Sequence, residues 1–154
     1  MAEDGPATLT LKNSTITANS AKWGGGIYSE GVFKVSQTIL ADNAIHAGGL
    51  GINCYLSEVT SMGFNLEGAD DCMLTGFGDL TNTPAGLGPL QDNGGPTWTH
   101  ALLPGSAAID AGNPAFMMPP VYDQRGTGFP RVVNQRIDIG AYEAWLQVYL
   151  PFTR

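Results

Sequence analysis

An offset of 24 residues relates two segments near the start of this chain. Residues 8–19 read TLTLKNSTITAN and residues 32–43 read VFKVSQTILADN. The offset aligns apolar with apolar and amide with amide: Leu9 with Phe33, Leu11 with Val35, Asn13 with Gln37, Ile16 with Leu40 and Asn19 with Asn43. Self-similarity at a period in the twenties indicates stacked supersecondary units.

Each repeat is expected to consist of short strands joined by bends. Glycine-rich segments follow both copies, at 23–31 and 47–52, and β-branched residues are frequent while no helical apolar period is present. A leucine-rich repeat would need a helical or 3₁₀ segment, so the pattern favours one turn of a parallel β-helix per repeat. We expect the aligned apolar pairs to stack in parallel register facing inward, and the aligned amides to form ladders at the bends. A sandwich with the same spacing is the alternative.

The rest of the chain is less regular. A looser third repeat follows at 59–66, and residues 87–112 are dense in Gly, Pro, Asn and Asp, which fix turns. We expect residues 81–143 to fold over the last coil as an irregular cap, because an open coil end is an exposed sheet edge. The prediction is one all-β domain over 1–154, with β-helix coils at 8–80 and a C-terminal strand or tail at 144–154.

The amino-acid composition argues against some classes of binding partner. Seven basic against 14 acidic residues give a net charge of −7, which argues against nucleic acid and anionic membrane surfaces. No apolar run has the length of a membrane span, so we expect no membrane insertion. The chain begins without a secretory leader, and we expect such a signal to be removed or to lie upstream.

Several motifs carry a family resemblance. They are Gly63-Phe64-Asn65-Leu66, Gly78-Asp79-Leu80, the run from Gly88 to Thr97 (GPLQDNGGPT), Ser106 to Gly112 (SAAIDAG), Asp123 to Gly126 (DQRG) and Asp138 to Glu143 (DIGAYE). Together they resemble the C-terminal region of bacterial choice-of-anchor Q domain proteins, and the upstream coils are similar to polymorphic outer-membrane protein repeats. The resemblance covers about Thr8 to Glu143. It implies a right-handed parallel β-helix anchored at the bacterial cell surface or outside the cell, and it implies no demonstrated enzymatic activity.

Cys54 and Cys72 lie 18 positions apart. Two buried thiols are one interpretation, and a structural disulfide is the other. The extracellular location that the resemblance implies favours the disulfide.

One group of charged residues has motif character: Asp110, Asp123, Arg125, Asp138 and Glu143. The carboxylates could act as general acid and base on a sugar, or as Ca²⁺ ligands. We favour a buried structural network in which Arg125 bridges carboxylates and loop carbonyls. His46 and His100 have no nucleophilic partner at a recognisable spacing. We therefore assign no catalytic, cofactor-binding or metal-binding residue and expect no cofactor.

The sequence leaves three candidate functions. The first is a non-enzymatic structural or adhesive module, with a polysaccharide or another cell-surface molecule as ligand. The second is a self-assembling filament or surface-layer subunit that joins coil ends through the tail, with these candidate residues: Leu146, Val148, Tyr149, Leu150 and Phe152. The tail folding back along its own helix is the alternative to that contact. The third is a fragment of a carbohydrate-active β-helix protein, which rests on shared architecture alone.

Overall fold

The computed structural model describes residues 6–133 and 135–145, and this part of the chain is all-β and without helices. The strands are short. They are β1 (Thr8–Lys12), β2 (Thr15–Ile16), β3 (Ser20–Trp23), β4 (Ile27–Ser36), β5 (Ile39–Leu40), β6 (Ala44–Leu50), β7 (Cys54–Ser61), β8 (Leu66–Glu67), β9 (Leu87–Gln91) and β10 (Thr99–Leu102).

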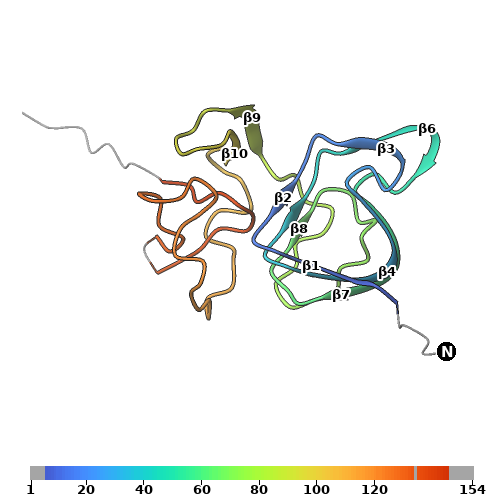
Figure 1. Cartoon of the computed structure of the whole chain (residues 1–154), viewed down its shortest axis with the longest axis horizontal. Helices are drawn as coiled ribbons and strands as arrows, with labels where there is room; N and C mark the ends of the chain where they lie inside the picture. Colours follow the sequence, from blue (N-terminus) through green and yellow to red (C-terminus); the bar gives the residue numbers. More distant parts are fainter. Residues whose placement is uncertain (1–5, 134, 146–154) are drawn as a thin grey trace, which may run out of the picture.

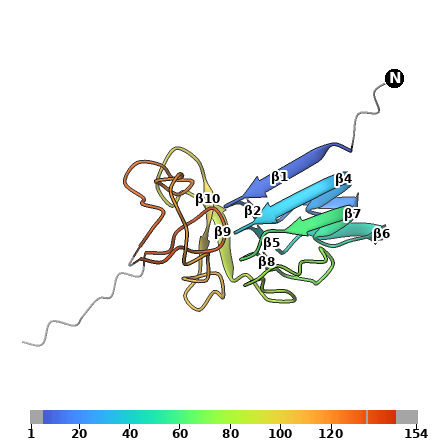
Figure 2. The same ribbon diagram turned by 90° about the horizontal axis from the view of Figure 1, so that it is seen from below.

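The first eight strands form three parallel sheets. Sheet A has the order β1-β4-β7, sheet B has the order β2-β5-β8, and sheet C pairs β3 with β6. The chain passes through the three sheets in turn and then begins again one layer further on, so that each sheet stacks equivalent strands (Figures 1 and 2). The period of strands, bends and strands seen in the sequence is therefore the period of the fold.

The predicted register is confirmed. Leu9 pairs with Phe33 and Leu11 with Val35 in sheet A. Ile16 pairs with Leu40 in sheet B. The third layer is displaced by two to three more residues, because Phe33 pairs with Val59 and Leu40 with Glu67. Within sheet A, Ser29 pairs with Leu56 and Val32 with Glu58, so the register shifts by one residue between them.

The bends recur at equivalent positions. Asn13, Gln37 and Phe64 each follow a strand or its last paired residues, and their φ angles are 49°, 50° and 56°. Left-handed backbone is disfavoured for residues with a Cβ, and asparagine tolerates it best, which fits Asn13 but not Gln37 or Phe64. A second bend repeats at Ala18 and Asp42, with φ of 58° and 56°.

Only one of the two predicted amide ladders is present. Asn43 Oδ1 accepts hydrogen bonds from Asn19 N at 3.0 Å and from Asn19 Nδ2 at 3.2 Å, so the 19–43 ladder is confirmed. Asn13 and Gln37 do not bond each other. Asn13 Oδ1 accepts from Arg131, and Gln37 Oε1 accepts from the main-chain N–H of Asn113. These two amides satisfy groups of the C-terminal region instead.

The interior of the stack is an apolar core. Phe33, Val35 and Leu40 are fully buried there, together with Cys72 and Leu74 from the segment after β8. Leu11 packs against this cluster as predicted. Leu9 shares the face of Leu11 but remains 47% exposed, because β1 is the outermost strand of sheet A and nothing in the described chain covers it.

The C-terminal region lies beside the stack, whereas we expected it to cover the last coil (Figures 1 and 2). It contains the antiparallel pair β9–β10 and a series of turns. Ile39, Ala41 and Leu66 point away from the stack interior and form a second core with Leu102, Ala108 and Ile139. Sheet B is thus apolar on both faces, and its outer face requires a cover.

The contact between the two parts is close. Gly140 N donates to Gln37 O at 3.0 Å, and Ala141 N donates to Thr15 Oγ1 at 3.1 Å. Gly140 has a φ of 106°, and a Cβ there would lie 2.8 Å from Ile39 Cδ1. Glycine at this position allows the backbone to approach sheet B.

The predicted tail strand falls almost wholly outside the described residues, and so do the assembly candidates Leu146, Val148, Tyr149, Leu150 and Phe152. Ala144 and Trp145, its first two residues, are not in a strand. In the described part of the chain, no helix could cross a membrane.

Candidate functional site

The predicted charge network centres on Arg125. Its Nη2 lies 2.6 Å from Asp123 Oδ2, and its Nε lies 3.0 Å from the same oxygen. Arg125 Nη2 also donates to the main-chain oxygen of Glu143 at 2.7 Å. Asp123 Oδ2 in turn accepts from Glu143 N at 2.9 Å. Arg125 and Asp123 are both buried, so this pair closes the loop at 123–126 onto the DIGAYE segment.

Two aromatic rings enclose the Arg125 guanidinium. Its Cζ lies 4.0 Å from the ring centroid of Phe129 and 3.8 Å from that of Tyr142. A planar guanidinium between two π faces gains cation–π attraction, which is larger where water is excluded.

Arg131 is a second buried cation, which was not among the residues expected from the sequence. It is 1% exposed, and its Nη1 lies 3.0 Å from Glu143 Oε1 as an ion pair without hydrogen-bond geometry. Its Nη2 donates to Asn13 Oδ1 and to Asp138 O, both at 3.1 Å. Burial lowers the pKa of Arg131, and the attraction of Glu143 opposes that effect. The charge balance of the predicted network could have indicated a second cation, because that network contained four acidic residues and only one basic residue.

Asp138 and Glu143 accept main-chain hydrogen bonds within the network. Asp138 receives Asp110 N at 2.7 Å and Ala144 N at 2.6 Å, and Glu143 receives Asp138 N at 3.1 Å. Burial raises the pKa of both carboxyl groups, that of Glu143 to about 8. The Asp110 side chain is exposed, so this residue contributes its N–H rather than its carboxylate.

The arrangement favours the structural interpretation of these acids over the catalytic one. Asp123, Arg125, Asp138 and Glu143 lie together. The carboxylate oxygens of the three acids contact N–H and guanidinium groups from several turns of the C-terminal region. A general acid must be within reach of a substrate, and these groups are buried.

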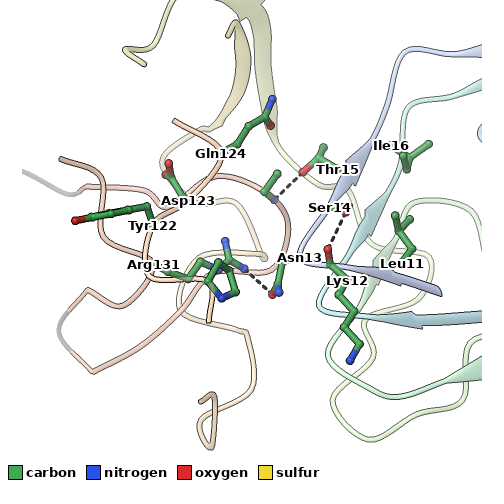
Figure 3. Close-up of a pocket in the computed structure, with 12 residues that line it drawn as sticks. Leu11, Lys12, Asn13, Ser14, Thr15, Ile16, Tyr122, Asp123, Gln124 and Arg131 are labelled. Carbon is green, nitrogen blue, oxygen red and sulfur yellow. Dashed lines mark hydrogen bonds between the residues drawn. The ribbon is translucent and has the colours of Figure 1, made fainter. Parts of the chain in front are cut away.

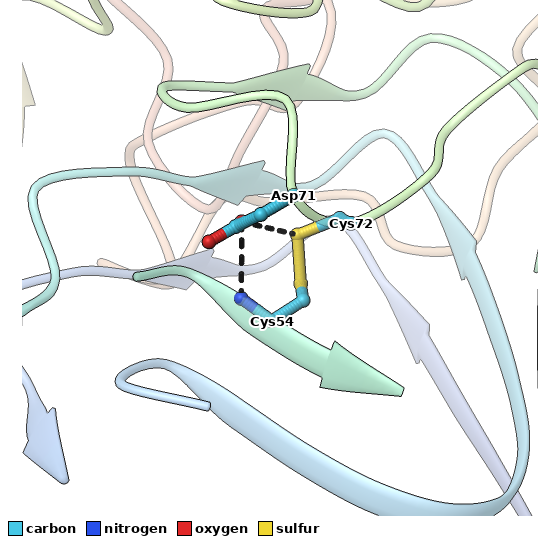
Figure 4. Close-up of side chains that lie close together, drawn as sticks. All are labelled: Cys54, Asp71 and Cys72. Atoms are coloured by element: carbon cyan, nitrogen blue, oxygen red, sulfur yellow. Dashed lines mark hydrogen bonds between the residues drawn. A yellow bond between two sulfur atoms is a disulfide. The ribbon is translucent and has the colours of Figure 1, made fainter. Parts of the chain in front are cut away.

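The disulfide between Cys54 and Cys72 is confirmed, with a Cα–Cα distance of 4.9 Å (Figure 4). It ties the start of β7 to the segment below the last layer. Asp71, next to it, accepts hydrogen bonds from Asn53 N at 3.0 Å and Cys54 N at 3.2 Å. Among the described residues, Cys54, Asp71 and Cys72 are the one group with metal-ligand spacing, but their sulfur atoms are bonded to each other.

Glu67 is a fully buried carboxyl group beside Asp71. Its Oε1 accepts from Cys72 N at 2.8 Å and from Asp71 N, while its Oε2 has no hydrogen-bond partner. Burial is the main cause that raises the pKa of Glu67 to about 7, and the nearby Asp71 carboxylate adds to it. No sequence pattern pointed to this residue, because a Leu-Glu pair at the end of a strand normally places the Glu in solvent.

A hollow of about 540 Å³ lies at the seam between sheet B and the C-terminal region (Figure 3). Its walls come from the bend at Asn13 and from the turns around Tyr122 and Arg131. The hydrogen bonds Arg131–Asn13 and Ala141–Thr15 cross the seam in this place. Tyr122 is 41% exposed.

A second hollow of about 360 Å³ continues the first one along the seam. The two share Thr15, Ile16, Gln124 and Ala141, and the second ends at Trp98 and His100 of the β9–β10 hairpin. Trp98 is 64% exposed. We call the two together the seam groove, defined by Asn13, Thr15, Trp98, His100, Tyr122 and Gln124.

A separate group of exposed aromatic residues lies on sheets A and C. The rings of Tyr28 and Tyr55, which are paired in register, are stacked with centroids 5.9 Å apart, and Trp23 lies 5.6 Å from Tyr55. Tyr28 is 50% exposed and Tyr55 is 42% exposed. His46 lies in β6, the strand of sheet C that pairs with the strand of Trp23, and its Nε2 lies 3.5 Å from Ser20 Oγ.

No family model, curated protein or solved structure matches this chain.

Proposed function

We propose that this chain is a non-enzymatic structural and adhesive module of an extracellular or cell-surface protein, built on a right-handed parallel β-helix. The single observation that carries the proposal is the parallel register, which repeats with nearly the same offset in all three sheets. A chain that returns to the same sheet in parallel, layer after layer, winds as a solenoid, and parallel crossovers are right-handed in nearly all known cases.

Two observations support the extracellular location. The disulfide is compatible with an oxidising compartment, where such bonds persist. The motifs from Gly63 to Glu143 resemble the C-terminal region of choice-of-anchor Q domain proteins. In this chain they form the segments that close the last layer and cover sheet B, which gives the resemblance a structural reason: these residues complete a β-helix at its end and side.

The adhesive role is supported by the exposed surface. A solenoid presents long lateral faces, and this one has a groove at its seam and an exposed aromatic group on another side. The buried acids bind backbone N–H groups and arginines, which supports a non-enzymatic role.

The test combines retention with product formation. The purified oxidised chain is mixed with insoluble polysaccharides and with bacterial cells, sedimented, and the bound fraction is measured. The supernatant is assayed for new reducing ends and for unsaturated uronates. We expect retention without product, with a reduced and alkylated sample as the control for non-specific binding. Steady release of either product would show that the chain is an enzyme.

A second candidate function is end-to-end assembly into a filament or surface layer. In the described part of the chain, β1, β2 and β3 each pair on one side only. An open edge of stacked strands accepts a further strand, and a contact between unlike ends propagates instead of closing. Light scattering over a wide concentration range tests this candidate, because assembly predicts a particle mass that grows with concentration.

A further inference from the structure

We propose that the seam groove binds a linear, uncharged oligosaccharide, with Trp98 and Tyr122 stacking on sugar rings at its two ends. The inference rests on the proposed adhesive function and names its ligand class.

The aromatic ends supply the apolar contacts. Trp98 is 64% exposed and Tyr122 is 41% exposed, and each borders one of the two connected hollows. Other exposed rings are present on this chain, and these two are set apart because each lines a hollow, where an aromatic face can stack on a ligand. The C–H faces of a pyranose ring are apolar and match an aromatic face, while its hydroxyl groups point sideways towards polar neighbours.

The second hollow has no lysine, arginine or acidic residue in its lining, and the first has the exposed Lys12 together with the buried Asp123 and Arg131. The wall offers the Gln124 amide, the Asn19 Oδ1 and the Thr17 hydroxyl, while Asn19 Nδ2 already donates to Thr17 O and Asn43 Oδ1. His100 Nδ1 lies 2.7 Å from Gly88 O and therefore carries the proton in that contact, which leaves Nε2 for a ligand hydroxyl. Neutral donors and acceptors set between two rings suit a chain of hydroxyl groups.

Other ligand classes fit this groove less well. A nucleic acid meets a chain of net charge −7 and would be repelled. A peptide added as a strand would need a long free edge, but β2 in the floor has two residues, and Thr15 Oγ1 already accepts Ala141 N. The number of hydrogen bonds left for a peptide backbone is therefore small.

The experiment is calorimetric titration of the intact oxidised chain with β-1,4-linked hexasaccharides of glucose, xylose, mannose and N-acetylglucosamine, and with hexagalacturonate as the acidic comparison. We expect at least one neutral hexasaccharide to bind more tightly than hexagalacturonate. Trp98→Ala should weaken that binding roughly tenfold, and Tyr122→Ala by a smaller factor, because each removes a stacking face. Trp98→Phe should retain most of the affinity.

Trp23→Ala is the matched control, because Trp23 is also exposed and lies in the separate aromatic group. It should leave the affinity unchanged. Melting curves that coincide with the wild type show that each variant is folded.

The outcomes separate this inference from the proposed function. If Trp98→Ala and Tyr122→Ala keep full affinity, or if Trp23→Ala alone loses it, the groove assignment is wrong while adhesion stands. Retention on polysaccharides or cells without binding of any neutral hexasaccharide overturns the ligand class. Failure of both retention and titration overturns the adhesive function as well.

Discussion

Replacing Glu67 by Gln should remove a large part of the pH dependence of stability. The carboxyl group is fully buried, with one oxygen bonded to two main-chain N–H groups and the other without a partner. Its pKa is raised by burial from 4.5 to about 7. The folded state therefore binds this proton more tightly than the unfolded state, and the stabilisation is complete below the unfolded pKa and is lost as pH rises through about 7.

The magnitude follows from the pKa. One pKa unit corresponds to about 1.4 kcal/mol. The rise of the Glu67 pKa thus predicts a loss of about 3 kcal/mol in the free energy of unfolding between about pH 4.5 and pH 8. Gln has the same shape, keeps the oxygen that accepts the two N–H groups and does not titrate, so the variant should lack this loss.

The assay is urea unfolding followed by tryptophan fluorescence at several pH values. Glu143, whose pKa of about 8 adds a loss of the same sign, is present in both proteins and cancels in the difference. Glu58→Gln on the exposed surface of β7 is the matched control and should follow the wild type. Parallel stability curves for Glu67→Gln and the wild type would refute the reasoning, because they would show that Glu67 titrates normally in the folded chain.

Three further predictions concern the brace, the disulfide and the open edge. Arg125→Ala should destabilise the chain by about 3 kcal/mol or more by leaving Asp123 buried without its cation, whereas the exposed Arg136→Ala should change stability by under about 0.5 kcal/mol in the same unfolding assay. Reduction of the disulfide, which closes an 18-residue separation, should cost about 3 kcal/mol, and non-reducing peptide mass spectrometry should find the linked pair. Leu9→Lys on the outermost strand should lower any concentration-dependent particle mass, and an unchanged mass would exclude this edge as the contact.

Local repetition explains what the sequence allowed us to predict. A constant offset between equivalent residues requires only that each repeat has the same path, so Leu9 over Phe33 and Ile16 over Leu40 could be written down before any tertiary contact was known. The disulfide was favoured over two free thiols only by the extracellular location that the family resemblance implies, and the structure contains it. Residues of the charge network were predicted from motifs in the sequence. Its second cation, Arg131, belongs to none of these motifs, and its burial depends on loops that are distant in the sequence.

We expected the C-terminal region to cover the last coil, and this expectation was wrong. The region packs on the outer face of sheet B, and the repeat period does not show that this face is apolar. Ile39 and Leu40 are neighbours in one two-residue strand and are both fully buried, so they face opposite sides. The run Ile-Leu-Ala at 39–41 is the signal: a strand with consecutive apolar residues is covered on both faces. In a strand of only two residues, such an apolar run looks the same as that of a strand buried on one face.

The same contact explains why one amide ladder formed and the other did not. Asn19 and Asn43 bond each other at their bend, and in the described part of the chain neither side chain hydrogen-bonds to the C-terminal region. Asn13 and Gln37 lie at the bend that faces it, where their oxygens accept hydrogen bonds from Arg131 and from the N–H of Asn113. An amide oxygen that accepts a hydrogen bond across the seam cannot also accept one within the ladder. If Asn13 and Gln37 bonded each other instead, a buried guanidinium N–H of Arg131 would lose a partner, which costs more free energy than the missing ladder bond. The bend amides thus hold the C-terminal region against the side of the stack, and the seam groove is the space that remains beside these few contacts.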